Sequence, residues 1–368
     1  MSSVFIPAHG GQLRELAAKF GVPETSLIDF SASINPLPPS DSLLETLCEL
    51  IRARKILTNY PDSGYGELKE AIAVYAGVDA NTIVVGNGVM SLLAAALRAL
   101  RISRCLVLVP GFGQYRQVLA ASGAGASTLT LRAEEGFTVN HESVLAYLKS
   151  TSAQALLFAN PHSPSGHLMP AAELMELQRA ASDLGVTMIV DEAFIDYSPE
   201  ESLSQAAAKS RSLVVLRSLT KFFSMPGLRV GYAVVHPDVR AALEPCIPAW
   251  SVSSIAAEAA RLALSDQVMI TTARVTNVVE RRWLTSQLQE HGLRVFPGEA
   301  NYLLLKIDEG SNGYELWRRL IVEQRVVVRS CANFEGLDEH YFRVGVRTRA
   351  ENQFMLAALA QLLKPGNR

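Results

Sequence analysis

A lysine, Lys221, lies in the segment LRSLTKFFSMPGLRVGYAVV (residues 216–235), between two apolar runs that look like buried strands. Arg229 follows it eight positions later. Apolar surroundings and a nearby cation both lower the pKa of an amine, and a neutral amine is a nucleophile that forms a Schiff base with an aldehyde. A lysine taken alone is ordinarily a solvated surface residue, so this interpretation depends on what accompanies Lys221.

Polar and glycine residues follow other apolar runs of the chain. Asp191 comes directly after TMIV, and Gly86 and Gly88 precede the helix-like segment VMSLLAAALRAL. Backbone N–H groups at the start of a helix bind anions. An amine nucleophile, an acid to face a ring nitrogen and a phosphate site are together what pyridoxal phosphate requires, and Ser218 and Arg229 would complete the phosphate shell.

Three further residues suit the ring of this cofactor. Phe112 can stack on one face, Ala193 is small enough for close approach to the other, and Asn160 can donate to the ring hydroxyl. Each residue also has an ordinary structural interpretation: Asp191 as a helix cap, Phe112 as part of the core and Asn160 as a turn former before proline. Their shared position after predicted strands favours the functional interpretation.

The elements that position these residues alternate between short apolar runs and longer helix-compatible segments. The runs are TIVVG 82–86, CLVLVP 105–110, ALLFANP 155–161, TMIVDEAF 187–194 and LVVLRS 213–218. Continuous apolar runs predict strands buried on both faces, hence an α/β fold with a mainly parallel sheet covered by helices. Ligands of such sheets lie at the carboxyl ends of the strands.

The chain is long enough for two domains. We expect a large domain over residues 41–245 and a small α+β domain over residues 246–368, which begins with a helical stretch from about Ser254 to Glu290. The small domain should also contain strand-like runs after Gly292 and a terminal helix at about 349–363. Residues 1–40 should run across the surface and pack with the small domain.

Composition excludes several classes of function. The formal net charge is -2, and no run of Lys or Arg could follow a nucleic-acid backbone. The four cysteines have no CxxC spacing, so neither a metal site nor a disulfide framework is indicated. No segment resembles a signal peptide or a membrane span, so we expect a cytoplasmic enzyme.

At this point the sequence resembles the fold-type I pyridoxal-phosphate enzymes, the class I/II aminotransferase superfamily, and within it the histidinol-phosphate aminotransferase branch. The matching motifs are the lysine segment with Arg229, NPHSPSG 160–166, DEAF 191–194 and NYPD 59–62. The resemblance implies a seven-stranded sheet in the large domain, a cofactor bound covalently to Lys221, and Gly88 and Val89 at its phosphate. It also implies a homodimer in which Tyr60 reaches the cofactor phosphate of the partner.

Other motifs resemble the L-threonine-O-3-phosphate decarboxylases of cobalamin biosynthesis within this branch. They are AHGG 8–11, LIDFSASINPL 27–37, DEAFIDY 191–197 and VVRSCANFEGL 327–337. Histidinol-phosphate aminotransferases usually have tyrosine where this chain has Phe194, which favours the decarboxylase. NPHSPSG in place of the commoner NPNNPTG, and Gly111 in PGFGQY, depart from the pattern and leave the choice of substrate open.

The bond that breaks in such enzymes is the one held perpendicular to the cofactor ring, so a decarboxylase must hold its substrate by a group other than the carboxylate. For a phosphorylated amino acid this group is the phosphate, which arginine binds well. The resemblance places His9, Asn35, Arg329 and Arg343 at the substrate, with their division of labour open. Arg347 and Arg349 are interpreted as solvated ion-pair partners.

Two other functions stay open on sequence grounds. One is an aminotransferase that acts on histidinol phosphate or a related amino acid with the same cofactor. The other is a regulatory or scaffold protein that keeps a degenerate cofactor fold, although every position expected to contact the cofactor has a competent residue.

Overall fold

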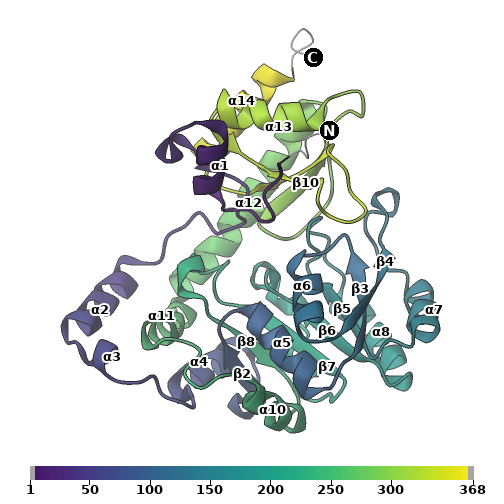
Figure 1. The fold of residues 1–368 in the computed structure, drawn as a ribbon. Coiled ribbons are helices and arrows are strands. Elements are labelled where there is room, and N and C mark those ends of the chain that lie inside the picture. The colour runs from purple at the N-terminus through teal and green to yellow at the C-terminus, as the bar shows by residue number, and fades with distance from the viewer. Residues whose placement is uncertain (1–4, 364–368) are drawn as a thin grey trace.

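The computed structural model describes residues 5–363, and a seven-stranded sheet lies at the centre of its larger part (Figure 1). The strand order is β2-β8-β7-β6-β5-β3-β4, and β8 alone runs antiparallel to its neighbours. The strands of this large sheet are β2 (Ile83–Gly86), β3 (Arg104–Val109), β4 (Gly125–Thr130), β5 (Ala155–Ala159), β6 (Thr187–Asp191), β7 (Leu213–Ser218) and β8 (Gly231–Val234). This confirms the predicted α/β fold with a mainly parallel sheet.

The five predicted apolar runs all form strands of this sheet, whereas β4 has no such run. Its sequence, GASTLT, is small and polar, and its residues are exposed or half-buried because β4 lies at the edge of the sheet. An edge strand lacks the continuous apolar pattern that revealed the central strands.

Helices cover both faces of the large sheet. Leu106 and Leu108 of β3 pack with the helices of one face, and Val107 and Val109 pack with those of the other, as the two-residue period of a strand requires. The first group of helices is α4 (Gly66–Ala76), α7 (His141–Thr151), α8 (Ala171–Asp183) and α11 (Ser254–Ser265), and the second is α5 (Val89–Ala99), α6 (Gln114–Ala121) and α10 (Pro237–Leu243).

A smaller antiparallel sheet, in the order β12-β13-β10-β9, lies above the large one in Figure 1. Its strands are β9 (Arg294–Val295), β10 (Tyr302–Lys306), β12 (Arg329–Ser330) and β13 (Tyr341–Gly345). It shares a second core with α1 (Leu13–Phe20), α13 (Gly313–Val322) and α14 (Arg349–Leu362).

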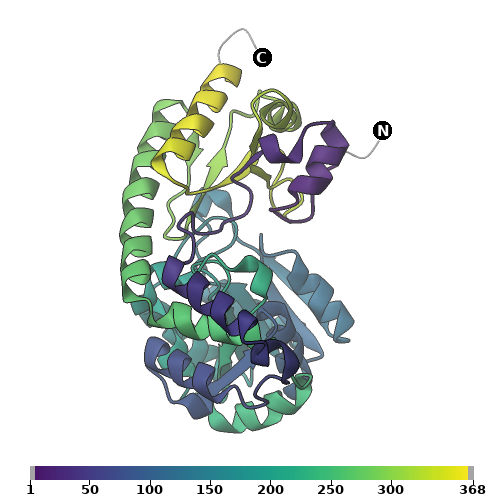
Figure 2. The same ribbon diagram turned by 90° about the vertical axis from the view of Figure 1, so that its left-hand side faces the viewer.

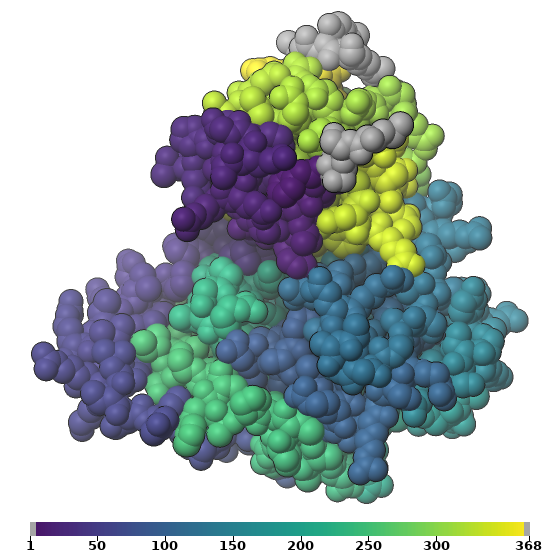
Figure 3. All heavy atoms as spheres, viewed as in Figure 1, coloured from purple at the N-terminus to yellow at the C-terminus, as the bar shows by residue number. Residues whose placement is uncertain are grey.

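The N-terminal segment lies against these C-terminal elements (Figure 3). Strand β1 (Ile28–Asp29) pairs in parallel with β11 (Val326–Val327), and Phe30 is fully buried in the same core. The chain then returns to the large part through α2 (Asp41–Arg52) and α3 (Lys55–Thr58). The division of the chain into domains at residues 40 and 245 stays a prediction. Helix α11 follows residue 245, yet its apolar residues pack in the core of the large sheet.

The predicted helical stretch from Ser254 to Glu290 is divided in two. Helix α11 ends at Ser265, and α12 (Gln267–Glu290) begins after Asp266, whose carboxylate accepts a hydrogen bond from the N–H of Met269. Asp266 therefore acts as an N-cap that periodicity alone did not reveal. Helix α12 then extends from the core of the large sheet to that of the small sheet (Figure 2).

The remaining α-helix within residues 5–363 is the short α9 (Ser204–Ala207). Within residues 5–363, no helix combines the length and the apolar character needed to cross a membrane.

Candidate active site

Two adjoining cavities lie beside the carboxyl ends of the parallel strands. The first, of about 160 Å³, contains Asp191 in its wall, and we call it the Asp191 cavity. The second, of about 240 Å³, contains Arg329, and we call it the Arg329 cavity. Four residues line both: Phe112, Phe194, Lys221 and Arg343.

Most of the predicted cofactor residues meet in the Asp191 cavity. Its wall includes Gly88, Val89, Phe112, Asp191, Ala193, Ser218, Lys221 and Arg229. These residues come from the ends of β2, β3, β6 and β7 and from the turn before β8, which the sheet order brings side by side. The arrangement therefore follows from the parallel topology.

Lys221 follows β7, and its backbone carbonyl accepts a hydrogen bond from the N–H of Asn35 at 3.1 Å. Burial lowers the pKa of its amine to about 8, and the charges of Arg343 and Arg229 act in the same direction. A neutral, nucleophilic amine is therefore accessible near physiological pH.

This lowered pKa predicts a stability effect in the cofactor-free protein. An amine with a pKa of about 8 when folded and 10.5 when unfolded binds its proton more weakly in the folded state, so its charge is destabilising at every pH below 8. One pKa unit corresponds to about 1.4 kcal/mol, so Lys221→Met should raise the unfolding free energy by up to about 3 kcal/mol at about pH 7. The gain should shrink as pH rises from 8 toward 10.5, since the unfolded chain then also loses this proton.

Urea denaturation of the two proteins at about pH 7 and pH 10 measures the effect. Lys209→Met, at an exposed position, is the matched control and should change stability little at either pH. An equal gain from both substitutions, or a gain at Lys221 that does not depend on pH, would contradict the prediction.

Asp191 ends β6, and each of its carboxylate oxygens has a hydrogen-bond donor. The hydroxyl of Tyr115 donates to Oδ2 at 2.7 Å, and the N–H of Ala193 donates to Oδ1 at 3.0 Å. Burial raises the pKa of Asp191 to about 6, while Tyr115, Ala193 and the charge of Lys221 act to lower it. A cationic ring placed in the cavity would supply the positive charge that this buried carboxylate lacks.

The start of α5 has the features of a phosphate site. Gly88, with φ of 73°, is the N-cap, and no side chain caps the helix. A Cβ at Gly88 would lie 2.9 Å from Nη2 of Arg229, so the guanidinium group lies directly against this turn and would have to move to admit a larger residue. Free backbone donors, the helix dipole and a guanidinium group therefore converge on one place, as a bound phosphate requires.

Four predicted residues lie outside the walls of both cavities. Gly86 ends β2, and its carbonyl accepts a hydrogen bond from the N–H of Gly88 at 2.8 Å. Asn160 is buried, and its side chain exchanges two hydrogen bonds with the backbone of Met169, which fix the position of its amide; its contact to the cofactor ring stays a prediction. The side chain of Asn35 donates to the carbonyl of Phe222, which anchors the Lys221 turn. Tyr60 is 79% exposed and stacks on Trp250.

The predicted substrate residues His9, Arg329 and Arg343 meet in the Arg329 cavity. Arg329 and Arg343 face each other across the β12–β13 pair. Among residues 5–363, neither has a carboxylate within ion-pair distance. Burial, assisted by the charge of Arg343, lowers the pKa of Arg329 to about 10.

Their remaining contacts are to neutral groups. Arg329 donates to the carbonyl of Ala8 at 2.9 Å and to Oδ1 of Asn333 at 2.7 Å. The contacts of Arg343 to Ser163 and Ser31 are long, at 3.4 and 3.5 Å, and its buried Nε has no partner. Two guanidinium groups without acidic partners make the cavity suitable for an anion. Arg347 and Arg349 instead form ion pairs with Glu351 and Glu280.

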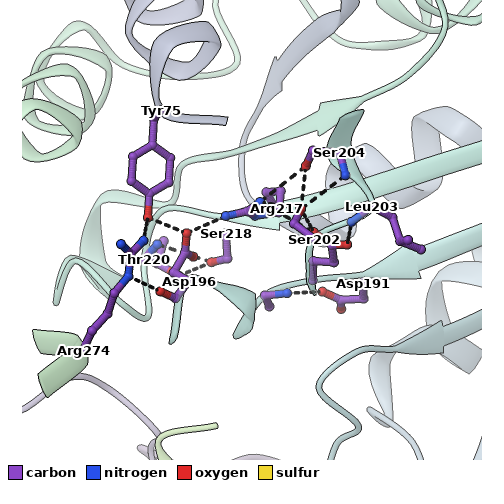
Figure 4. A network of polar contacts seen from close by, with 12 residues as sticks. Tyr75, Asp191, Asp196, Ser202, Leu203, Ser204, Arg217, Ser218, Thr220 and Arg274 are labelled. Atoms are coloured by element: carbon purple, nitrogen blue, oxygen red, sulfur yellow. Dashed lines mark hydrogen bonds and ion pairs between the residues drawn. The ribbon is translucent and has the colours of Figure 1, made fainter. Parts of the chain in front are cut away.

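A buried polar network lies behind the Asp191 cavity, and the sequence interpretation missed it (Figure 4). Arg217 is 2% exposed and forms ion pairs with Asp196 and Glu192. The hydroxyl of Tyr75 also donates to Asp196, at 2.8 Å. Glu192 follows Asp191, and Arg217 precedes Ser218, so alternation along the strands could have indicated that these two side chains point away from the cavity.

Other cavity residues were also missed: Met90, Gln114, Tyr115, Ala159, Ser163 and Thr220. Gln114 and Tyr115 follow Phe112 at the start of α6, so the motif PGFGQY contained the signal for both.

Comparisons with known proteins identify the family of the chain. The model of the family "Aminotransferase class I and II" matches residues 25–359. Threonine-phosphate decarboxylase of Salmonella typhimurium is 36% identical over 98% of both chains. The adenosylcobalamin biosynthesis bifunctional protein of Leptospira interrogans is 30% identical over 97% of this chain and 41% of its own length.

A solved structure shows the same architecture. Histidinol-phosphate aminotransferase of Clostridium acetobutylicum superposes with a TM-score of 0.84 at 27% identity, over 92% of this chain and 99% of its own. The shared fold and the family match over nearly the whole chain together establish that this protein belongs to the aminotransferase class I and II family.

Proposed function

We propose that this protein is a pyridoxal-phosphate-dependent decarboxylase that converts L-threonine O-3-phosphate to (R)-1-aminopropan-2-ol O-2-phosphate for cobalamin biosynthesis. The observation that carries the proposal is the pair of arginines beside Lys221, the buried Arg329 and the half-buried Arg343, which have no acidic partners among the described residues. The 36% identity to the Salmonella decarboxylase over 98% of both chains supports this choice of reaction.

The residues of the Asp191 cavity fit pyridoxal phosphate. Lys221 would bind its aldehyde carbon, Asp191 would face its ring nitrogen, and Phe112 and Ala193 would enclose its ring. Gly88, Val89, Ser218 and Arg229 would hold its phosphate. When bound, pyridoxal phosphate supplies an electron sink for a bond at the substrate Cα.

Substrate binding falls to the residues of the Arg329 cavity. Arg329 and Arg343 would bind the phosphate of the substrate by charge-assisted hydrogen bonds, and His9 lies in the same wall. Phe112 and Phe194 line both cavities, so a carboxylate held beside them would be poorly solvated. Loss of its charge as carbon dioxide is then favoured.

The reaction breaks the bond between Cα and the carboxylate and adds a proton at Cα. Lys221 lines both cavities, and its pKa of about 8 lets Nζ give and take a proton near neutral pH. We propose Lys221 as the group that handles this proton.

Incubation with L-threonine O-3-phosphate in the absence of any keto acid tests the function. The proposal predicts release of carbon dioxide and of aminopropanol phosphate. Product formation that requires 2-oxoglutarate, without carbon dioxide, would instead establish the aminotransferase, which the family match and the Clostridium structure favour as the second candidate. A purified protein that neither binds pyridoxal phosphate nor turns over would support the scaffold alternative.

The arginine assignment makes a separate prediction. Arg343 is half-buried, and loss of one charge-assisted contact costs about 1.5–3 kcal/mol, so Arg343→Gln should weaken binding of L-threonine O-3-phosphate by about ten- to a hundred-fold. Arg318→Gln is the control, since Arg318 is a surface residue of α13 paired with Glu315. Titration with substrate and with inorganic phosphate measures the effect, and equal affinity in the two variants would rule out this role of Arg343.

The cytoplasmic location and the homodimer remain part of the proposal. Tyr60 is exposed beside Trp250, on the surface that also contains the exposed Leu57 of α3. Such a position would allow Tyr60 to reach the cofactor phosphate of a second copy of the chain.

A further inference from the structure

Tyr115 is a buried side chain to which the proposed function gives no role. It is 1% exposed and lies in the first turn of α6, and its hydroxyl lies 2.7 Å from Oδ2 of Asp191. Because the N–H of Ala193 donates to Oδ1 from the other side, the two oxygens are held by donors from different elements. A carboxylate held in this way keeps a single orientation.

The hydroxyl of Tyr115 also influences the charge of Asp191. Burial favours the neutral form of this carboxyl, and the hydrogen bond from Tyr115 opposes that effect by stabilising the anion. Burial and the charge of Asp191 raise the pKa of Tyr115 well above its usual range, so its hydroxyl keeps its proton and remains a donor. Hydrogen bonds from such a donor to an ionised acceptor are among the stronger ones in proteins.

The ring of Tyr115 contacts a second residue of the same cavity. It packs edge-to-face against Phe112, with centroids 5.7 Å apart and an interplanar angle of 86°. Tyr115 therefore touches both the side chain that would face the cofactor nitrogen and the side chain that would stack on the cofactor ring.

We propose that Tyr115 is a positioning residue, whose hydroxyl holds Asp191 as an oriented anion and whose ring sets the plane of Phe112. The inference rests on the proposed function, because the role is exerted toward bound pyridoxal phosphate. Tyr115 acts through Asp191 and Phe112 and handles no substrate atom itself.

The test uses the full chain with Tyr115→Phe, which removes one oxygen and keeps the ring. Two readouts are the dissociation constant of pyridoxal phosphate and the ¹⁵N NMR signal of cofactor labelled at the ring nitrogen, which reports protonation of that atom. We expect the dissociation constant to rise about tenfold and the signal to move toward that of unprotonated pyridine. Tyr232→Phe is the control. Tyr232 is equally buried, and its hydroxyl has no hydrogen-bond partner within residues 5–363, so both readouts should match the wild type.

A double-mutant cycle with Asp191→Asn separates this role from general packing. If Tyr115 acts through Asp191, Tyr115→Phe should leave the ring-nitrogen signal unchanged once Asp191 is already Asn. An unchanged signal and affinity for Tyr115→Phe alone would overturn the inference.

Two further outcomes are decisive. If Tyr115→Phe melts well below the Tyr232→Phe control, Tyr115→His is measured in its place, because histidine keeps a hydrogen-bond donor. A wild-type nitrogen signal in Tyr115→His supports the inference. A signal shifted toward unprotonated pyridine overturns it. A wild-type chain that binds no pyridoxal phosphate defeats the proposed function itself. Normal binding by the wild type, with the affinity and the nitrogen signal both unchanged in Tyr115→Phe, defeats only the role of Tyr115.

Discussion

Lys221→Ala should abolish turnover of L-threonine O-3-phosphate while leaving the fold intact. The substitution removes both the amine that would bind the cofactor and the group proposed to handle the proton at Cα. Loss of the general acid–base contribution alone costs about 10²–10⁴-fold in rate. Carbon dioxide release from purified variants, with circular dichroism as the check on folding, measures the effect.

Lys209→Ala is the matched control, because Lys209 is exposed and lines neither the Asp191 nor the Arg329 cavity. It should retain wild-type turnover. Wild-type turnover by Lys221→Ala as well would remove this lysine from the mechanism.

Asp191→Asn should lower kcat by about 10²–10³-fold, the range found when one preorganised electrostatic group is removed from an active site. Asparagine keeps the size of the side chain and removes the negative charge that would stabilise a protonated ring nitrogen. Because burial already disfavours the charged form of Asp191, the cofactor-free variant should be no less stable than the wild type near neutral pH.

Steady-state kinetics with saturating cofactor, together with thermal melting, distinguishes the two effects. Asp183→Asn, at an exposed position in the last turn of α8, is the control and should change neither kcat nor the melting temperature. A kcat for Asp191→Asn equal to that of the control would show that the charge of Asp191 takes no part in the chemistry.

The central strands could be predicted because burial on both faces leaves an unmistakable sequence pattern. LVVLRS and TMIVDEAF are continuous apolar runs that end in polar residues, and both form strands of the large sheet. β4 and the break at Asp266 could not be predicted in the same way. An edge strand such as β4 is exposed or half-buried, so it needs no continuous apolar run. An aspartate within a helical pattern, such as Asp266, is an N-cap only when the chain turns there.

The site was predictable to the extent that its residues stand at strand ends. Lys221, Asp191 and Gly88 lie far apart in sequence and meet only because parallel strands end at one edge. The position of a residue after a strand does not determine where its side chain points, so individual side-chain contacts could not be predicted. The hydrogen bonds between the Asn160 amide and the backbone of Met169 are one example. The motif PGFGQY placed Tyr115 near Phe112, but not the direction of its hydroxyl toward Asp191.

Covalent attachment of the cofactor tests the central claim most directly. The protein is saturated with pyridoxal phosphate, reduced with borohydride, digested and analysed by mass spectrometry. If Lys221 binds the cofactor covalently, we expect a yellow protein whose colour is lost on reduction and a pyridoxyl group on the peptide that contains Lys221. A protein that stays colourless, or a pyridoxyl group on other lysines with Lys221 unmodified, would contradict it.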